Sequence, residues 1–144
     1  MSQRERLSLR NRNWRENLKK FVGRVLKNFN DVTIILFGSR ARGDYSALSD
    51  TDLLVILEHY DLDILKRIYS IAYDVDLIAP EIHIFAEDFV LENFEENTVL
   101  LDAICEGVVL VDNLNIVKLL RARLKRMIDE GWLKTSKGWF KVKR

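Results

Sequence analysis

Residues 37–55 have the sequence FGSRARGDYSALSDTDLLV, which joins two apolar segments through a polar connection. The first apolar segment covers residues 32–37 and the second covers residues 53–57. Short runs of branched apolar residues are typical of buried strands. Ten residues separate Ser39 from Asp50, and their polar, glycine-containing composition predicts a loop that folds back.

The end of the first strand has the features of a phosphate-binding turn. Gly38 lacks a Cβ, so the backbone there can approach a ligand closely. A helix that begins at this point would present free N–H groups and a dipole that favours an anion. Ser39 adds a hydroxyl donor, and Arg40 and Arg42 add guanidinium groups that fit phosphate oxygens.

The start of the second strand carries two carboxylates. Asp50 and Asp52 are two positions apart, so on a strand they point to the same side of the sheet. Two carboxylates so close repel each other unless a cation lies between them or one of them binds a proton. Hard oxygen ligands that face a phosphate-binding turn suit Mg²⁺ bridging to a nucleotide.

The pattern Gly-Ser, ten residues, Asp-x-Asp resembles the signature of the DNA polymerase β-like nucleotidyltransferase superfamily. Residues 37–57 are most similar to its minimal (MNT) branch, which consists of stand-alone domains of little more than a hundred residues. The resemblance spans residues 14–112 at the level of the fold. It implies an α/β (α+β) nucleotidyltransferase fold, a mixed sheet of four or five strands packed with helices. The alternative interpretation of this pattern is a surface turn followed by an unrelated capping aspartate.

The resemblance also implies a reaction: Mg²⁺-dependent transfer of a nucleoside monophosphate, AMP from ATP, to an acceptor hydroxyl, with release of pyrophosphate. Asp50 and Asp52 would hold two Mg²⁺ ions. Gly38 and Ser39 would bind the β- and γ-phosphates, while Arg40 and Arg42 would offset their charge.

The superfamily uses a third catalytic carboxylate, which binds metal or acts as general base, on a strand beside the second one. Residues 75–78 and 81–85 could each form that strand, with Ala79-Pro80 between them. On a strand over residues 81–85, Glu81 would face the same way as His83 and Phe85. Glu81 is therefore the first candidate for the third ligand, Asp76 the alternative, and Asp74 a further one.

Helical spacing of apolar residues recurs along the rest of the chain. It predicts helices over residues 14–29, 61–73, 86–106 with a break near Glu95, and 115–129. A fourth strand is expected at residues 108–111. Residues 132–135 and 139–142 flank Ser136-Lys137-Gly138 and predict a hairpin, either a packed flap or a basic aromatic surface for nucleic acid.

The length of 144 residues indicates one domain. We divide it into a basic N-terminal arm, mobile or loosely helical (residues 1–13), a nucleotidyltransferase domain (14–113), and a basic helix with hairpin (114–144). Residues 1–30 carry nine Lys/Arg against two acids, residues 31–113 four against eighteen, and residues 114–144 ten against two. The acidic middle fits a metal-dependent site. The basic ends fit RNA or an acidic partner, or are solvated helix faces.

The single cysteine, Cys105, fits a reducing cytoplasm, and its apolar neighbours predict a place in the core. The sequence contains no apolar run long enough for a membrane span and no signal peptide.

The resemblance to the minimal branch implies a separate partner, a HEPN-type RNase AMPylated on tyrosine, so that the chain would act as antitoxin in a toxin–antitoxin pair. RNA and small molecules are alternative acceptors, and a homodimer could supply a small-molecule site. A non-catalytic module that binds nucleotide or caps a toxin is the alternative to an enzyme.

Overall fold

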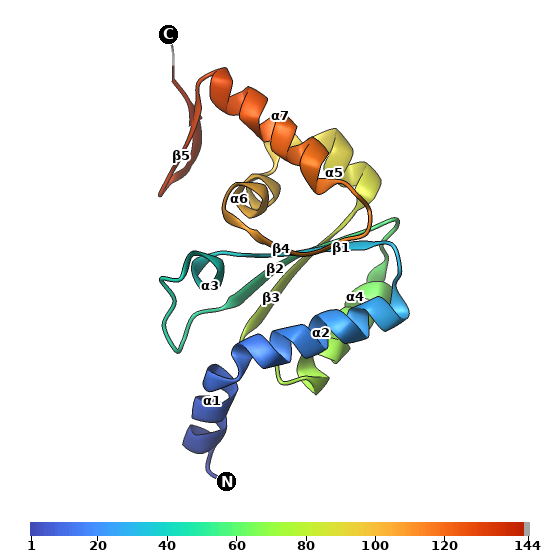
Figure 1. The fold of residues 1–144 in the computed structure, drawn as a ribbon, viewed down its shortest axis with the longest axis vertical. Coiled ribbons are helices and arrows are strands. Elements are labelled where there is room, and N and C mark those ends of the chain that lie inside the picture. Colours follow the sequence, from blue (N-terminus) through green and yellow to red (C-terminus); the bar gives the residue numbers. More distant parts are fainter. Residues whose placement is uncertain (143–144) are drawn as a thin grey trace.

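A four-stranded mixed sheet forms the centre of the computed structural model, which describes residues 1–142 (Figure 1). The strand order is β3-β2-β1-β4, in which β1 pairs antiparallel with β2 and β4, and β2 pairs parallel with β3. This is the mixed sheet predicted from the sequence. The elements are α1 (Gln3–Arg12), α2 (Trp14–Asn28), β1 (Val32–Phe37), α3 (Ser39–Arg42), β2 (Thr51–Leu57), α4 (Leu62–Asp74), β3 (Pro80–Ala86), α5 (Glu87–Asn93), the 3-10 helix η1 (Phe94–Glu96), α6 (Thr98–Glu106), β4 (Val108–Asp112), α7 (Val117–Asp129), β5 (Trp132–Thr135) and β6 (Gly138–Lys141).

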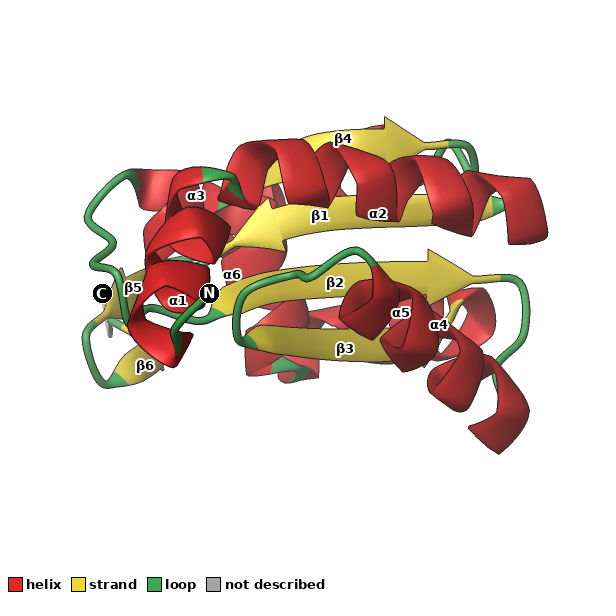
Figure 2. Ribbon diagram, turned by 90° about the horizontal axis from the view of Figure 1, so that it is seen from below, coloured by secondary structure: helices red, strands yellow, loops and turns green. Residues whose placement is uncertain are grey.

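Helices cover both faces of the sheet, because β1 and β2 are apolar at every second position on each side. Leu53 and Val55 of β2 pack with α2 and α4, whereas Leu54 and Ile56 pack with α5, α6 and α7. Figure 1 shows these two helical layers on opposite sides of the sheet, and Figure 2 shows α2 running along β1. The second layer matters for function, since it lies on the side to which Asp52 belongs.

Short-range sequence features determine where several of these helices and strands begin and end. The Asp61 side chain accepts a hydrogen bond from Ile64 N (2.9 Å) and so caps α4. The predicted break near Glu95 is the 3-10 helix η1, and Asn97 caps the helix that follows. The predicted hairpin is present as β5 and β6. It follows α7 on the side of the sheet covered by α6 (Figure 1).

Three expectations differ from the structure. We expected a mobile or loosely helical arm at the N-terminus, but residues 3–12 form the regular helix α1. A capping box between Ser2 and Glu5 stabilises the start of this helix. Residues 75–78 form a turn rather than a strand. Its apolar side chains fill the core beneath α2, and the strand begins only at Pro80, which needs no ladder donor at a first position. Cys105 is exposed and not in the core, because the buried side of α6 falls on its neighbours Leu101 and Ile104.

No helix within residues 1–142 is long and apolar enough to cross a membrane.

Candidate active site

Strand register brings the predicted site residues to one end of the sheet. Phe37, the last residue of β1, pairs with Asp52 of β2, and Asp52 pairs with Glu81 of β3. Gly38 therefore begins its turn directly beside Asp52. Glu81 stands on the other side of Asp52, on the edge strand.

The carboxylates of Asp50, Asp52 and Glu81 converge. Each offers an oxygen, and the three oxygens lie within 4.8 Å of one another. Three oxygen ligands on a rigid sheet end are the donor set that Mg²⁺ prefers. The structure thus brings together both aspartates and the first candidate for the third carboxylate, and their role as metal ligands stays a prediction.

Asp76, the alternative third ligand, lies elsewhere. It occupies the turn after α4 with φ +61°, and its Oδ1 accepts a hydrogen bond from Arg10 Nη2 at 2.7 Å. This turn closes the connection into β3 on the side of α1, so Asp76 cannot complete the carboxylate trio. Glu81 takes that place because the strand begins at Pro80 and includes it.

The electrostatics of Asp52 fit a site made for a cation. The pKa of Asp52 is raised to about 6, mainly by partial burial and further by the nearby charges of Glu81 and Asp50. The Arg42 guanidinium acts in the opposite direction and lowers this pKa. A divalent cation among the carboxylates would remove the repulsion, so the residues present fit the metal that the sequence implied.

Thr51 holds the two aspartates in position, a role that the sequence analysis missed. Its side chain is fully buried, and its Oγ1 donates to Ile78 O at 2.6 Å. Its backbone N donates to Ala79 O at 2.9 Å. These bonds fasten the start of β2 to the turn before β3, which fixes Asp50 and Asp52 relative to Glu81. On a strand a residue between the two aspartates faces the opposite side of the sheet, and this alternation is the signal that could have revealed the role of Thr51.

The backbone geometry at residue 38 suits only glycine. The φ of Gly38 is +74°, and a Cβ built there would overlap the Asp52 carboxylate. Ser39 begins the four-residue helix α3, and both residues line a pocket with Asp50 and Asp52.

The two arginines of the loop differ in their surroundings. Arg42 lines the pocket, and its Nη1 donates to Glu106 Oε1 at 3.0 Å. Arg40 is only 3% exposed and is absent from the described lining of the pocket. Its guanidinium donates to Ser49 O at 2.9 and 3.2 Å, and it packs against the Trp14 ring. Because its donors hold the loop between α3 and β2, Arg40 is not placed to bind phosphate, contrary to the sequence expectation.

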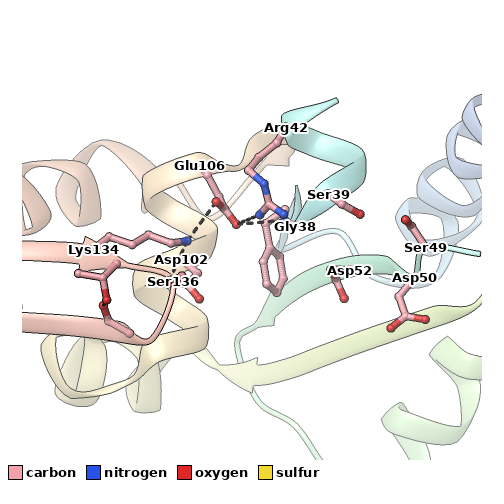
Figure 3. A pocket seen from close by; sticks show the side chains of 13 residues that line it. Gly38, Ser39, Arg42, Ser49, Asp50, Asp52, Asp102, Glu106, Lys134 and Ser136 are labelled. Atoms are coloured by element: carbon pink, nitrogen blue, oxygen red, sulfur yellow. Dashed lines mark hydrogen bonds and ion pairs between the residues drawn. The ribbon is translucent and has the colours of Figure 1, made fainter. Parts of the chain in front are cut away.

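The pocket has a volume of about 790 Å³ and extends beyond the motif residues. Its far wall consists of α6 and the C-terminal hairpin (Figure 3). Residues from these elements were not among the predicted site residues, because they share no motif and lie more than 40 positions after the aspartates. The lining residues are Phe37, Gly38, Ser39, Arg42, Ser49, Asp50, Asp52, Asp102, Glu106, Lys134, Thr135, Ser136 and Gly138.

Comparisons with known proteins agree with this geometry. Residues 18–111 match the family described as nucleotidyltransferase domain. A Methanocaldococcus jannaschii protein named "Putative protein adenylyltransferase MJ0141" is 38% identical over 76 residues, which is 47% of this chain and 74% of that protein.

Two solved structures share the fold. A toxin–antitoxin structure with AMP-PNP superposes with a TM-score of 0.54 and 18% identity, covering 76% of this chain and 85% of that chain. A mutant of the toxin–antitoxin MntA-HpeT gives a TM-score of 0.51 and 20% identity, covering 75% and 83%. With a family match over most of its length and the carboxylate trio beside Gly38, the chain belongs to the nucleotidyltransferase domain family.

Proposed function

We propose that this protein transfers AMP from ATP to a hydroxyl group of a partner protein. The observation that carries the proposal is the convergence of three carboxylate oxygens within 4.8 Å, at the sheet end where Gly38 begins its turn. The name of the M. jannaschii relative, a protein adenylyltransferase, supports a protein acceptor. The AMP-PNP in a structure of the same fold supports an adenine nucleotide.

The pocket is suited to the nucleotide. Its volume of about 790 Å³ lies within the ~300–1,000 Å³ usual for small-molecule sites. The backbone N–H of Gly38, the hydroxyl of Ser39 and the guanidinium of Arg42 supply donors for the phosphates. With Asp50 and Asp52 opposite them, the α-phosphate would lie between the donors and the carboxylates.

Transfer requires a bond between the acceptor oxygen and the α-phosphorus, while the bond to the β-phosphate oxygen breaks and pyrophosphate leaves. Asp50, Asp52 and Glu81 would hold two Mg²⁺, which when bound neutralise phosphate charge and lower the pKa of the acceptor hydroxyl. Glu81 is absent from the described lining of the nucleotide pocket, and its side chain is 53% exposed on the edge strand. It is thus a carboxylate that a macromolecular acceptor can reach from outside the nucleotide pocket, and we assign it the acceptor's proton.

The acceptor that we propose is a tyrosine hydroxyl of a HEPN-type toxin, with this chain as the antitoxin. Two observations support a partner of this kind. The two solved structures compared above are described as toxin–antitoxin structures. The exposed position of Glu81 leaves that side of the site open to a large acceptor.

The test is incubation of the protein with α-labelled ATP, Mg²⁺ and its co-purified partner, followed by electrophoresis and a pyrophosphate assay. The wild type should label the partner and release pyrophosphate. The double variant Asp50→Asn, Asp52→Asn should do neither and should retain its circular dichroism spectrum. Asp63→Asn, an exposed position on α4, is the matched control and should behave as the wild type. Full activity in the double variant would refute the metal role.

Other results of the same assay point to other functions. Label on RNA or on a small molecule would replace the protein acceptor. Nucleotide binding without release of pyrophosphate under any condition would make the chain a non-catalytic module.

A further inference from the structure

The C-terminal hairpin forms a wall of the pocket although it lies outside the family match, which ends at residue 111. Four of its residues line the pocket: Lys134, Thr135, Ser136 and Gly138. Only Lys134 among them carries a charge. Lys134 and the proposed phosphate-binding turn at Gly38 and Ser39 line the same pocket.

One carboxylate connects Lys134 to that turn. Glu106 Oε1 accepts hydrogen bonds from Gly38 N at 3.3 Å and from Arg42 Nη1 at 3.0 Å. Glu106 Oε2 accepts from Lys134 Nζ at 3.0 Å. Figure 3 shows Lys134 and Arg42 reaching this carboxylate from two separate elements. Three donors therefore converge on a single anionic group, and two of them are the donors that we assign to the phosphates.

The hairpin is fastened well enough to present a side chain. Trp139 Nε1 donates to Asp102 Oδ1 at 2.9 Å, which ties β6 to α6. Trp132 and Trp139 both pack against the hydrophobic core on this side of the sheet. Lys134 Nζ lies 3.1 Å from the same Asp102 Oδ1, and its side chain is 30% exposed. A cation held between packed elements loses little freedom on binding an anion.

We propose, on the basis of the function proposed above, that Lys134 binds the β- or γ-phosphate of the nucleotide and so completes the triphosphate site from outside the family domain. An ammonium group is a common partner of phosphate oxygens. In the structure Glu106 and Asp102 hold Lys134, and Glu106 accepts from the donors that a phosphate oxygen would use. Lys134 is a binding residue here and takes no part in the proton transfer.

The experiment measures equilibrium binding by calorimetry in Mg²⁺, with AMP and with an ATP analogue that has a methylene group between the α- and β-phosphorus atoms. No transfer can occur with this analogue during the measurement. Lys134→Ala should weaken binding of the analogue by about tenfold and change binding of AMP by less than twofold. Lys134→Arg should restore most of the affinity. Lys137→Ala is the matched control in the turn of the same hairpin, exposed and absent from the described pocket lining, and should bind as the wild type.

Several results would overturn the proposal. Analogue binding by Lys134→Ala equal to that of the wild type would do so while leaving the proposed function intact, provided that the wild type still transfers AMP. An equal loss for AMP and the analogue, or no rescue by arginine, would assign Lys134 a structural role only. A wild type that binds no triphosphate would remove the proposed function and this inference together.

Discussion

The Asp52 carboxylate fills the space that a side chain on residue 38 would need. Gly38 also has φ +74°, a conformation that other residues adopt at a cost. Replacing Gly38 by alanine would therefore push Asp52 away from Asp50 and Glu81. We expect Gly38→Ala to lower the rate of AMP transfer by at least about a hundredfold, because a displacement near 1 Å has effects of that size. Steady-state kinetics with the co-purified partner measure this.

Gly23→Ala is the control for that substitution. Gly23 lies inside α2, where a Cβ meets nothing within 4 Å. Alanine there should stabilise the protein by up to about 1 kcal/mol and leave transfer unchanged. If Gly38→Ala were as active as Gly23→Ala, the close contact between residues 38 and 52 would have no role in positioning the carboxylates.

Asp52 should destabilise the metal-free protein above pH 6. Burial and its acidic neighbours raise its folded pKa to about 6 from an ordinary value of 3.8. The folded state therefore binds this proton more tightly than the unfolded state does, so the contribution of Asp52 to stability is fully present below pH 4 and is lost as pH rises through 6. Two pKa units correspond to about 2.7 kcal/mol, which partial exposure reduces to about 1 kcal/mol.

Asp52→Asn should then be more stable than the wild type by about 1 kcal/mol at pH 8 in EDTA, and the difference should vanish near pH 4. Urea unfolding at both pH values measures it. Added Mg²⁺ should stabilise the wild type but not the variant, since only the wild type keeps the full set of ligands. A variant less stable than the wild type at pH 8 without metal would contradict this account of Asp52.

Substitution of Arg40 should lower the stability of the protein, whereas substitution of Arg42 should weaken its use of ATP. Arg40→Ala removes a buried guanidinium that donates to Ser49 O and packs against Trp14 and Tyr45, so we expect a loss of about 3 kcal/mol in unfolding free energy. Arg42→Ala removes a half-exposed side chain, and we expect less than about 1 kcal/mol. The KM for ATP should instead rise about tenfold in Arg42→Ala. The reverse assignment of the two effects would show that the pocket is built differently.

Glu106 should compete with the nucleotide, because its Oε1 accepts from Gly38 N and Arg42. Glu106→Gln keeps the shape and removes the charge, so we expect the KM for ATP to fall about threefold. Glu96→Gln, exposed in η1, removes the same charge at a distance and should leave KM unchanged. A rise in KM for Glu106→Gln would mean that Glu106 orients Arg42 rather than competing with phosphate.

The sequence was sufficient where short-range patterns determine the structure. Short runs of branched apolar residues predicted β1 and β2, and the Asp-x-Asp spacing predicted that Asp50 and Asp52 lie on one side, where their oxygens do converge. Glu81 was preferred because a strand over residues 81–85 would place it on one face with His83 and Phe85, and β3 does include it. Asp76 could not be dismissed from sequence, because its φ of +61° depends on how the turn after α4 closes.

Contacts between distant segments account for what the sequence left out. Arg40 and Arg42 are equivalent in the motif, and only the packing of Trp14 and Tyr45 around Arg40 separates their roles. Lys134 is one of several basic residues near the C-terminus, and nothing local indicates that it reaches Glu106. These contacts join residues that are far apart in the sequence, so no periodic sequence pattern predicts them.

The hairpin also bears on the order in which the protein becomes competent during synthesis. Glu81 completes the carboxylate trio, but Lys134 leaves the ribosome 53 positions later. A nascent chain could therefore bind Mg²⁺ at the carboxylate trio well before it can bind a triphosphate. The late arrival of β5 and β6 would delay ATP capture until the hairpin has emerged and packed against α6.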